Sequence, residues 1–272
     1  MRAIEKNQEK QHSKAEQLAP SRGFDSLASW LIEPENRVRG TMQDWAISLS
    51  DTRVEQISHE NHALVTVSDF LSAPQDAVSA ATLQKFAKIT PQYPGIRAPL
   101  SAQIAHRWLT DLAPMLEEHF GKSATGWEIQ AWYSLVTTPA RELIPMQRFP
   151  HVDGTDPRQL AMMLYLHETD HGGTGFYAHK STGFTELTDE TFPRYRDALQ
   201  KDVARTGLPP AAYVTDGEPL FERVHATSGA FNQAVFYRGN LLHSGLIDES
   251  APLSPDPAKG RLTINAFFRP KA

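Results

Sequence analysis

The chain contains no cysteine among its 272 residues, and this absence excludes several classes of site at once. Disulfide bonds, iron-sulfur clusters, thiol nucleophiles and zinc sites built on thiolates all require cysteine. Any metal ion must therefore be held by histidine and carboxylate side chains. The sequence offers 11 histidines and 32 aspartates and glutamates for this purpose.

An excess of positive charge and long apolar segments are also absent. The 27 Lys and Arg residues stand against 32 Asp and Glu, which leaves a formal net charge of -5 and no cationic surplus to hold a nucleic-acid backbone. The longest apolar run, Leu160 to Leu166, is far shorter than the roughly 20 residues that span a bilayer. Met1 to Gln17 are polar and charged, unlike a signal peptide. We therefore expect a cytoplasmic protein with neither nucleic acid nor membrane as a partner.

Short segments rich in β-branched and aromatic residues dominate the second half of the chain, a pattern typical of strands. Seven segments show it: Glu128–Val136, Leu143–Phe149, Leu160–His167, Thr174–Ala178, Leu220–Ala226, Gln233–Tyr237 and Arg261–Phe268. A further strand is predicted at Ala63–Val67, and helical spacing occurs at Thr82–Ile89, Ile104–Phe120 and Asp189–Thr206. These patterns predict a mainly β protein with flanking helices, an α+β arrangement whose strands form a sandwich or barrel. Residues 1–40 are expected to be a polar N-terminal arm, and residues 41–272 a single domain.

Two histidines and one aspartate are the strongest candidates for a metal site. Side chains alternate along a strand, so His151 and Asp153, at the end of the predicted strand Leu143–Phe149, point to the same side. His243 closes another predicted strand in the same way. Two histidines and one carboxylate suit a non-haem Fe(II) ion that keeps open coordination positions.

This arrangement resembles the Fe(II)- and 2-oxoglutarate-dependent dioxygenases, in particular their prolyl-hydroxylase-like branch, over about Ala63 to Phe268. The family's iron ligands are a His-x-Asp pair and a distant histidine. The resemblance assigns these roles to His151, Asp153 and His243.

The resemblance also implies residues that hold the co-substrate. A basic residue on the last strand of the family's barrel binds the distal carboxylate of 2-oxoglutarate, and Arg261 is the match, with Thr263 on its face and Lys259 as the alternative. A tyrosine on the strand after His-x-Asp also bonds this carboxylate in the family, which points to Tyr165. A guanidinium can hold a carboxylate by paired, charge-assisted hydrogen bonds.

The fold and the reaction follow from the same resemblance. It implies a double-stranded β-helix, the cupin-like jelly-roll barrel, which uses Fe(II), 2-oxoglutarate and O2 and releases succinate and CO2. The enzyme would hydroxylate a small molecule or an amino-acid side chain of a peptide. An aspartate at position 153 favours hydroxylation over halogenation, because the family's halogenases lack this carboxylate and bind chloride there.

Several other residues could line the substrate site. Gln147 alternates with His151 along the predicted strand, which makes it a candidate substrate contact. Tyr93, Arg97, Arg148 and Lys180 could also contact a substrate, but we expect them to lie on the solvated surface. The strand aromatics, Trp132 and Phe267 among them, are expected to fill the barrel.

Two alternative functions are compatible with the sequence. The segment His167-Glu168-Thr169-Asp170-His171 fits His-Glu-x-x-His, the signature of zinc metallopeptidases, which requires a helix to bring both histidines to one face. The preceding run is strand-like and glycines follow directly, which disfavours a helix. The second alternative is a non-catalytic, cupin-like barrel that only binds a ligand.

Overall fold

The computed structural model describes residues 45–58, 60–121, 126–168, 171–216, 219–251 and 253–271. The predicted N-terminal arm, residues 1–40, lies outside the described residues. The elements are β1 (Asp51–Ile57), β2 (His62–Ser68), α2 (Pro74–Thr82), β3 (Gly95–Pro99), α3 (Ala102–Phe120), β4 (Trp127–Val136), the 3-10 turns η2 (Ala140–Glu142) and η3 (Pro145–Arg148), β5 (Leu160–Tyr165), β6 (Thr174–His179), α4 (Phe192–Thr206), β7 (Phe221–Ala226), β8 (Ala234–Arg238), β9 (His243–Gly245) and β10 (Leu262–Pro270). The prediction of a mainly β protein with flanking helices is confirmed.

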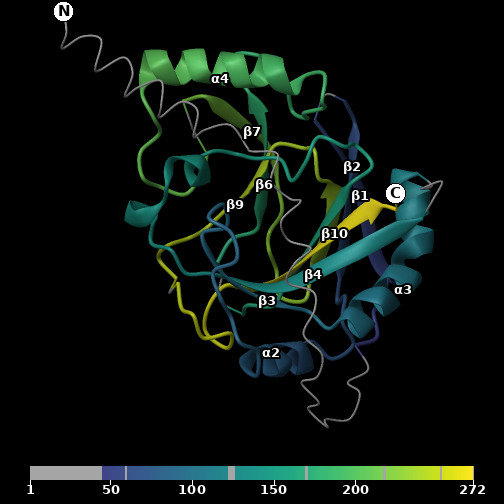
Figure 1. Ribbon diagram of the computed structural model, residues 1–272. Coiled ribbons are helices and arrows are strands. Elements are labelled where there is room, and N and C mark those ends of the chain that lie inside the picture. The colour runs from purple at the N-terminus through teal and green to yellow at the C-terminus, as the bar shows by residue number, and fades with distance from the viewer. Residues whose placement is uncertain are drawn as a thin grey trace, which may run out of the picture. The chain divides into compact units, whose positions relative to one another are not determined.

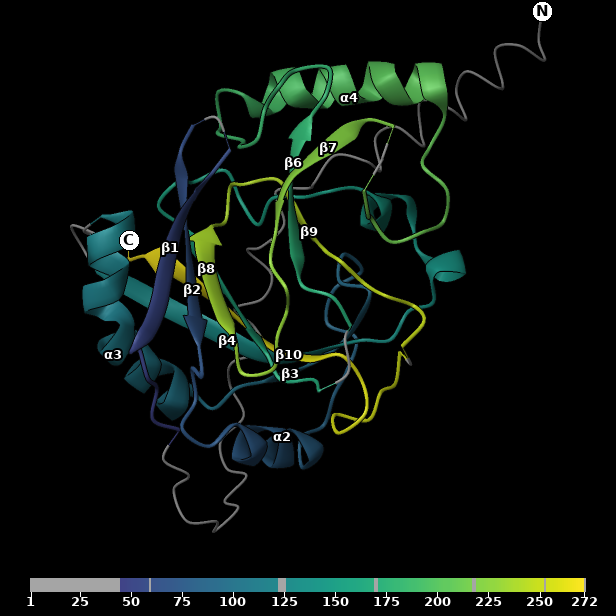
Figure 2. The same cartoon turned by 180° about the vertical axis from the view of Figure 1, so that it is seen from behind.

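The strands form two antiparallel sheets. The larger has the order β1-β2-β8-β5-β10-β4-β3, and the smaller has the order β7-β6-β9. Figures 1 and 2 show α3 beside the large sheet, on the side away from β6, β7 and β9. None of the helices that the structure describes has the length and apolar character of a membrane-spanning segment.

The large sheet separates two hydrophobic cores. One face packs on the helices, where Trp108 of α3 is fully buried with its ring 5.6 Å from that of Phe70. Burial of a large apolar side chain contributes roughly 1.5–3 kcal/mol, so this face holds α3 in place. The opposite face, which we call the site face, carries Tyr165, Thr263 and Tyr237. Phe176 of β6 packs with Tyr165 and Tyr237 in the second core, which therefore joins the two sheets.

Two of the predicted elements are wrong. Residues 143–149 are not a strand, because Pro145 begins the 3-10 turn η3 and the side chain of Gln147 accepts a hydrogen bond from the Ile144 N–H. Proline fixes φ and has no N–H for a ladder, and here it opens a helical turn. The predicted helix at residues 82–89 is also absent, because α2 takes Pro74 in its first turn and ends at Thr82.

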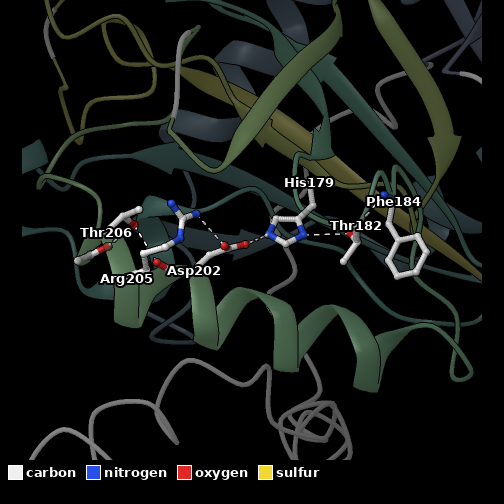
Figure 3. A network of polar contacts seen from close by, with 7 residues as sticks. His179, Thr182, Phe184, Asp202, Arg205 and Thr206 are labelled. Carbon is white, nitrogen blue, oxygen red and sulfur yellow. Dashed lines mark hydrogen bonds and ion pairs between the residues drawn. The ribbon is translucent and has the colours of Figure 1, made fainter.

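A buried polar network attaches α4 to the small sheet. Figure 3 shows the ring of His179, the last residue of β6, between Asp202, which belongs to α4, and Thr182, which lies in the turn after β6. The Nδ1 atom of His179 lies 3.0 Å from Thr182 Oγ1, and its Nε2 lies 3.4 Å from Asp202 Oδ2. Asp202 also accepts a hydrogen bond from Arg205. Burial lowers the pKa of His179, although the charge of Asp202 opposes this shift. A neutral His179 therefore joins the helix to the sheet.

This network predicts a fall in stability under mildly acidic conditions. The pKa of His179 is lower in the folded protein than its ordinary value of 6.5, so protons bind preferentially to the unfolded chain as the pH falls through 6.5. We expect the free energy of unfolding to decrease between pH 7 and pH 5, with His179 contributing a slope of up to about 1.4 kcal/mol per pH unit. Urea titrations should show a smaller slope for His179→Gln. Arg205→Gln, which removes only the outer partner of Asp202, should keep the wild-type slope, and equal slopes for His179→Gln and wild type would contradict this role.

Candidate metal centre

The backbone brings His151, Asp153 and His243 together, and they are the one group of metal-ligating side chains found among the described residues. One ligand atom from each of the three lies within 4.8 Å of the others. His151 and His243 form an isolated antiparallel bridge with two backbone hydrogen bonds of 2.8 Å. The Asp153 N–H donates to the carbonyl of Gly239 at 2.7 Å. Both segments that carry the triad are thus held by main-chain hydrogen bonds, which makes their geometry rigid.

A hydrogen bond from Nδ1 of His243 fixes the orientation of its ring. Nδ1 lies 2.8 Å from the carbonyl oxygen of Leu241, and because a carbonyl only accepts, Nδ1 carries the proton. The lone pair of Nε2 is then available to a metal, the arrangement that proteins use to orient histidine ligands. Nε2 lies 3.6 Å from Asp153 Oδ2, a buried atom that accepts no hydrogen bond from any described residue. A cation between these atoms would satisfy both, so the donor set fits a divalent metal.

Burial acts in opposite directions on the two neighbouring ligands: it keeps His151 neutral, as a metal requires, and disfavours the charged form of Asp153 while no cation is bound. Desolvation, followed by the charges of His243 and Arg97, lowers the pKa of His151 to about 3. The residue as a whole is exposed, which leaves a ligand access to the neutral imidazole. Burial raises the pKa of Asp153, while the charges of His243, Arg97 and Arg269 lower it. A buried carboxylate without a hydrogen-bond donor is costly, and a bound cation would offset that cost.

Arg261 is a fully buried charge on the site face. Its Nε donates to the carbonyl of His171 at 3.3 Å, and Nη2 donates to the carbonyls of Gly172 at 3.1 Å and Gly173 at 3.0 Å. No ion pair joins it to a carboxylate of the described residues, and Nη1 donates no hydrogen bond to them. Burial lowers its pKa, but a guanidinium stays charged at pH 7. Three carbonyls therefore orient Arg261 and leave Nη1 for a ligand.

Thr263 and Tyr165 lie beside this guanidinium. They are paired in register across β10 and β5, and the Arg261 guanidinium carbon is 5.8 Å from the centre of the Tyr165 ring. The hydroxyl of Thr263 donates to Asn265, whereas that of Tyr165 lies between Thr174, at 2.7 Å, and Thr227, at 3.1 Å. Both hydroxyls thus have protein partners here, and their contact with a co-substrate stays a prediction.

The His-Glu-x-x-His segment does not form a helix at its described residues. His167 and Glu168 follow the end of β5, and His171 lies outside the helices and strands. The functional part of this segment is instead the glycine pair that follows it. A Cβ on Gly172 would lie 1.9 Å from the Leu246 carbonyl oxygen, and one on Gly173 would lie 2.1 Å from that of Thr227. Only glycine allows this close approach, which presents three successive carbonyls to Arg261.

Gln147 and Lys259, two residues predicted to contact a ligand, have other partners in the structure. The side-chain amide of Gln147 donates to the carbonyl of Pro91 at 2.9 Å, so the alternation with His151 that suggested a substrate contact does not exist. Lys259, the alternative basic residue, is exposed and pairs with Asp256 at 3.2 Å. The buried position belongs to Arg261. Arg148 donates two hydrogen bonds to the carbonyl of Leu143, which gives it a structural role.

Tyr93 and Arg97, both expected on the solvated surface, are instead partly buried and packed against each other. Arg97 lies on β3, where its guanidinium carbon is 4.1 Å above the centre of the Tyr93 ring and 6.0 Å from that of Trp132. The charge of Asp153 raises its pKa against a larger lowering by burial. The Gly-Ile-Arg-Ala-Pro sequence of β3, bounded by prolines, hid this strand. A guanidinium thus lies on the site face, two strands from Thr263.

Comparison with known proteins gives one family and several solved structures. A model described as a family of unknown function, DUF6445, matches residues 49–268. No curated protein matches the chain. HygX from Streptomyces hygroscopicus, solved with nickel and 2-oxoglutarate bound, is 12% identical with a TM-score of 0.47, over 78% of this chain and 84% of that chain.

Two further solved structures are similar at the same level. A Pseudomonas putida prolyl-4-hydroxylase is 12% identical with a TM-score of 0.38, over 78% of this chain and 95% of that chain. The non-haem α-ketoglutarate dependent epimerase SnoN from nogalamycin biosynthesis is 11% identical with a TM-score of 0.42, over 78% of this chain and 79% of that chain. At these TM-scores the likenesses carry no functional conclusion, which depends on the residues of this chain.

Proposed function

The chain belongs to the DUF6445 family, to which no function is assigned, and we propose from its own site residues that it is an Fe(II)- and 2-oxoglutarate-dependent oxygenase. The proposed reaction is the hydroxylation of a small molecule or an amino-acid side chain, with release of succinate and CO2. We further propose that the two sheets are the halves of a double-stranded β-helix, with the site between them.

The observation that carries this proposal is the geometry of His151, Asp153 and His243. Their ligand atoms gather within 4.8 Å, Nδ1 of His243 donates to the Leu241 carbonyl so that Nε2 is the nitrogen on the side of Asp153, and Asp153 Oδ2 is buried without a donor among the described residues. Two imidazoles and one carboxylate leave half of an octahedral shell open, which is the donor set of non-haem Fe(II) oxygenases. Zinc hydrolysis through His167 and His171 would need a helix, and the described residues of this segment, His167, Glu168 and His171, are not helical.

The position of Arg261 supports the choice of co-substrate. A Cβ on Gly245 would lie 3.9 Å from Arg261 Nη2, so the guanidinium lies beside β9, the strand that also carries His243. His243 and Gly245 are two residues apart, which corresponds to about 7 Å along a strand. A five-carbon 2-oxo dicarboxylate can bridge a distance of this order. It would reach the metal with its 2-oxo acid end and Arg261 with the other end.

The bound metal would supply activation of O2, coupled to oxidative decarboxylation of 2-oxoglutarate. The residues of the chain perform the remaining tasks. His151, Asp153 and His243 would hold the metal with three ligands and leave coordination positions for the co-substrate and O2. Arg261, already oriented by three carbonyls, fixes the distal carboxylate by a charge-assisted hydrogen bond from Nη1.

Turnover of 2-oxoglutarate without a substrate tests this function. Purified protein with Fe(II) and ascorbate should form succinate slowly in air, and His243→Ala should reduce this rate to that of free Fe(II). Glu168→Gln removes the base that a zinc metallopeptidase would need and should keep the wild-type rate of succinate formation. Bound Fe(II) without succinate formation would favour the ligand-binding barrel, and zinc-dependent peptide hydrolysis that is lost in Glu168→Gln would contradict the proposal.

A further inference from the structure

The site face carries a second guanidinium that the metal centre and the co-substrate do not use. Arg97 pairs in register with Ser134 of β4, Ser134 pairs with Thr263 of β10, and Thr263 pairs with Tyr165 of β5. Residues in register on neighbouring strands point to the same face, so these four side chains form one row. With strands about 4.8 Å apart, Arg97 lies about 10 Å along this row from Thr263.

Arg97 has no anionic partner in the part of the chain that the structure describes. Its backbone N–H and carbonyl are both bonded to Ala87, at 2.8 and 2.9 Å, so the strand is held without the side chain. The buried Nε donates no hydrogen bond, and no carboxylate of the described residues forms an ion pair with the guanidinium. The residue as a whole is partly exposed, which leaves a ligand access to it. A partly buried guanidinium without an anionic partner readily binds an anion by charge-assisted hydrogen bonds.

Aromatic rings surround this guanidinium and give it a fixed orientation. The guanidinium carbon of Arg97 lies 4.1 Å from the centre of the Tyr93 ring. Stacking covers one flat face of the guanidinium, whereas its N–H groups point outward in its plane, where they can donate to a ligand. Trp132 of β4 lies next to it, and the Trp132 ring is 5.9 Å from that of Phe267 on β10. Trp132 and Phe267 are both partly exposed on the site face, so they offer apolar surface beside a single positive charge.

We propose that Arg97 binds the carboxylate of the substrate and that the substrate is a small carboxylic acid whose apolar part lies along Trp132 and Phe267. This inference rests on the proposed oxygenase function, because it places the substrate beside the triad. One guanidinium balances one negative charge, which matches a carboxylate rather than a doubly charged phosphate. The row that carries Arg97 ends at Thr263 and Tyr165, beside Arg261, which puts the anchored end of the substrate on the same face of the sheet as the co-substrate residues.

The test compares acids with their uncharged amides on the protein loaded with Mn(II) and 2-oxoglutarate without oxygen. The probes are phenylacetate, 3-phenylpropanoate and 4-phenylbutanoate, each with the corresponding amide, and Kd is measured by NMR titration. We expect at least one acid to bind roughly tenfold or more tightly than its amide. Arg97→Met, which keeps the aliphatic contact with Tyr93, should abolish this preference. Arg53→Met removes an exposed arginine of β1 and should retain it.

The outcomes separate this inference from the proposed function. A preference for acids that survives in Arg97→Met, or its absence in the wild type, overturns the role of Arg97. A loss of 2-oxoglutarate affinity in Arg97→Met as large as the loss for the acid also overturns it, because Arg97 would then hold the co-substrate. Wild-type protein that binds neither Mn(II) nor 2-oxoglutarate contradicts the oxygenase, whereas an Arg97-dependent preference for acids in that protein would still support the carboxylate site.

Discussion

Replacing Asp153 by asparagine will stabilise the metal-free protein and abolish its stabilisation by divalent metal. In the absence of metal, burial raises the pKa of Asp153, and its Oδ2 accepts no hydrogen bond from a described residue. Removing this charge should raise the free energy of unfolding by about 1–3 kcal/mol. Wild-type protein should gain about 2.7 kcal/mol from Mn(II) at 100 times its Kd. At 1,000 times its Kd the gain rises to about 4.1 kcal/mol, which exceeds the whole range expected for the variant, so the order of stability of the two proteins reverses.

Urea titrations with and without Mn(II), together with calorimetric titration of the metal, measure both parts of this prediction. The metal affinity of Asp153→Asn should fall by more than about 100-fold. Loss of a residue that only hydrogen-bonds to a metal ligand costs about 10–100-fold in affinity, and loss of the ligand itself should cost more. The matched control is Asp156→Ala, which removes a carboxylate three residues away that pairs with Arg158. This control should bind Mn(II) as the wild type does. An Asp153→Asn protein that retains metal affinity would show that Asp153 is not a ligand.

Arg261→Met will lower the affinity for 2-oxoglutarate by about 30-fold or more, which corresponds to the 2 kcal/mol or more lost when a buried charge pair is truncated. Metal affinity should remain, because Arg261 does not contact the triad's ligand atoms. The variant should also be less stable, since the carbonyls of His171, Gly172 and Gly173 lose the hydrogen bonds that Arg261 donates. Arg261→Lys should be intermediate, because an ammonium keeps the charge but not the fork of donors.

Calorimetric titration of 2-oxoglutarate into the Mn(II)-loaded proteins decides this prediction. Lys259→Met is the matched control, because it removes a neighbouring positive charge that is exposed and paired with Asp256. This variant should keep the wild-type affinity. If Lys259→Met loses 2-oxoglutarate and Arg261→Met does not, the co-substrate anchor is assigned to the wrong residue.

The position of the candidate metal site could be predicted from the sequence because its geometry depends on local rules. His151 and Asp153 are two residues apart, so an extended backbone points both side chains to one side. This holds although the predicted strand at residues 143–149 contains the 3-10 turn Pro145–Arg148, because the backbone is extended again from Phe149. The contact between the two distant segments of the site is the antiparallel bridge between His151 and His243. The sequence indicated this contact only by placing His243 at the end of a predicted strand.

The surroundings of the two arginines could not be predicted because they depend on contacts between distant segments. The partners of Arg261 are carbonyls of a glycine-rich turn about 90 residues earlier, and backbone atoms carry no side-chain signature. Arg97 lies on β3, a five-residue edge strand whose Gly95 and Pro99 are residues that weaken strand predictions. Its place in the row with Thr263 appears only when β3, β4 and β10 are paired.

Anomalous X-ray diffraction from crystals soaked with Fe(II) and 2-oxoglutarate without oxygen tests the metal centre most directly. Data collected on both sides of the iron absorption edge should show one strong peak at about 2.0–2.2 Å from His151, Asp153 and His243. Density for the co-substrate should extend from this peak to Nη1 of Arg261. A peak between His167 and His171 instead, or no peak at the triad under saturating Fe(II), would contradict the assignment of this site.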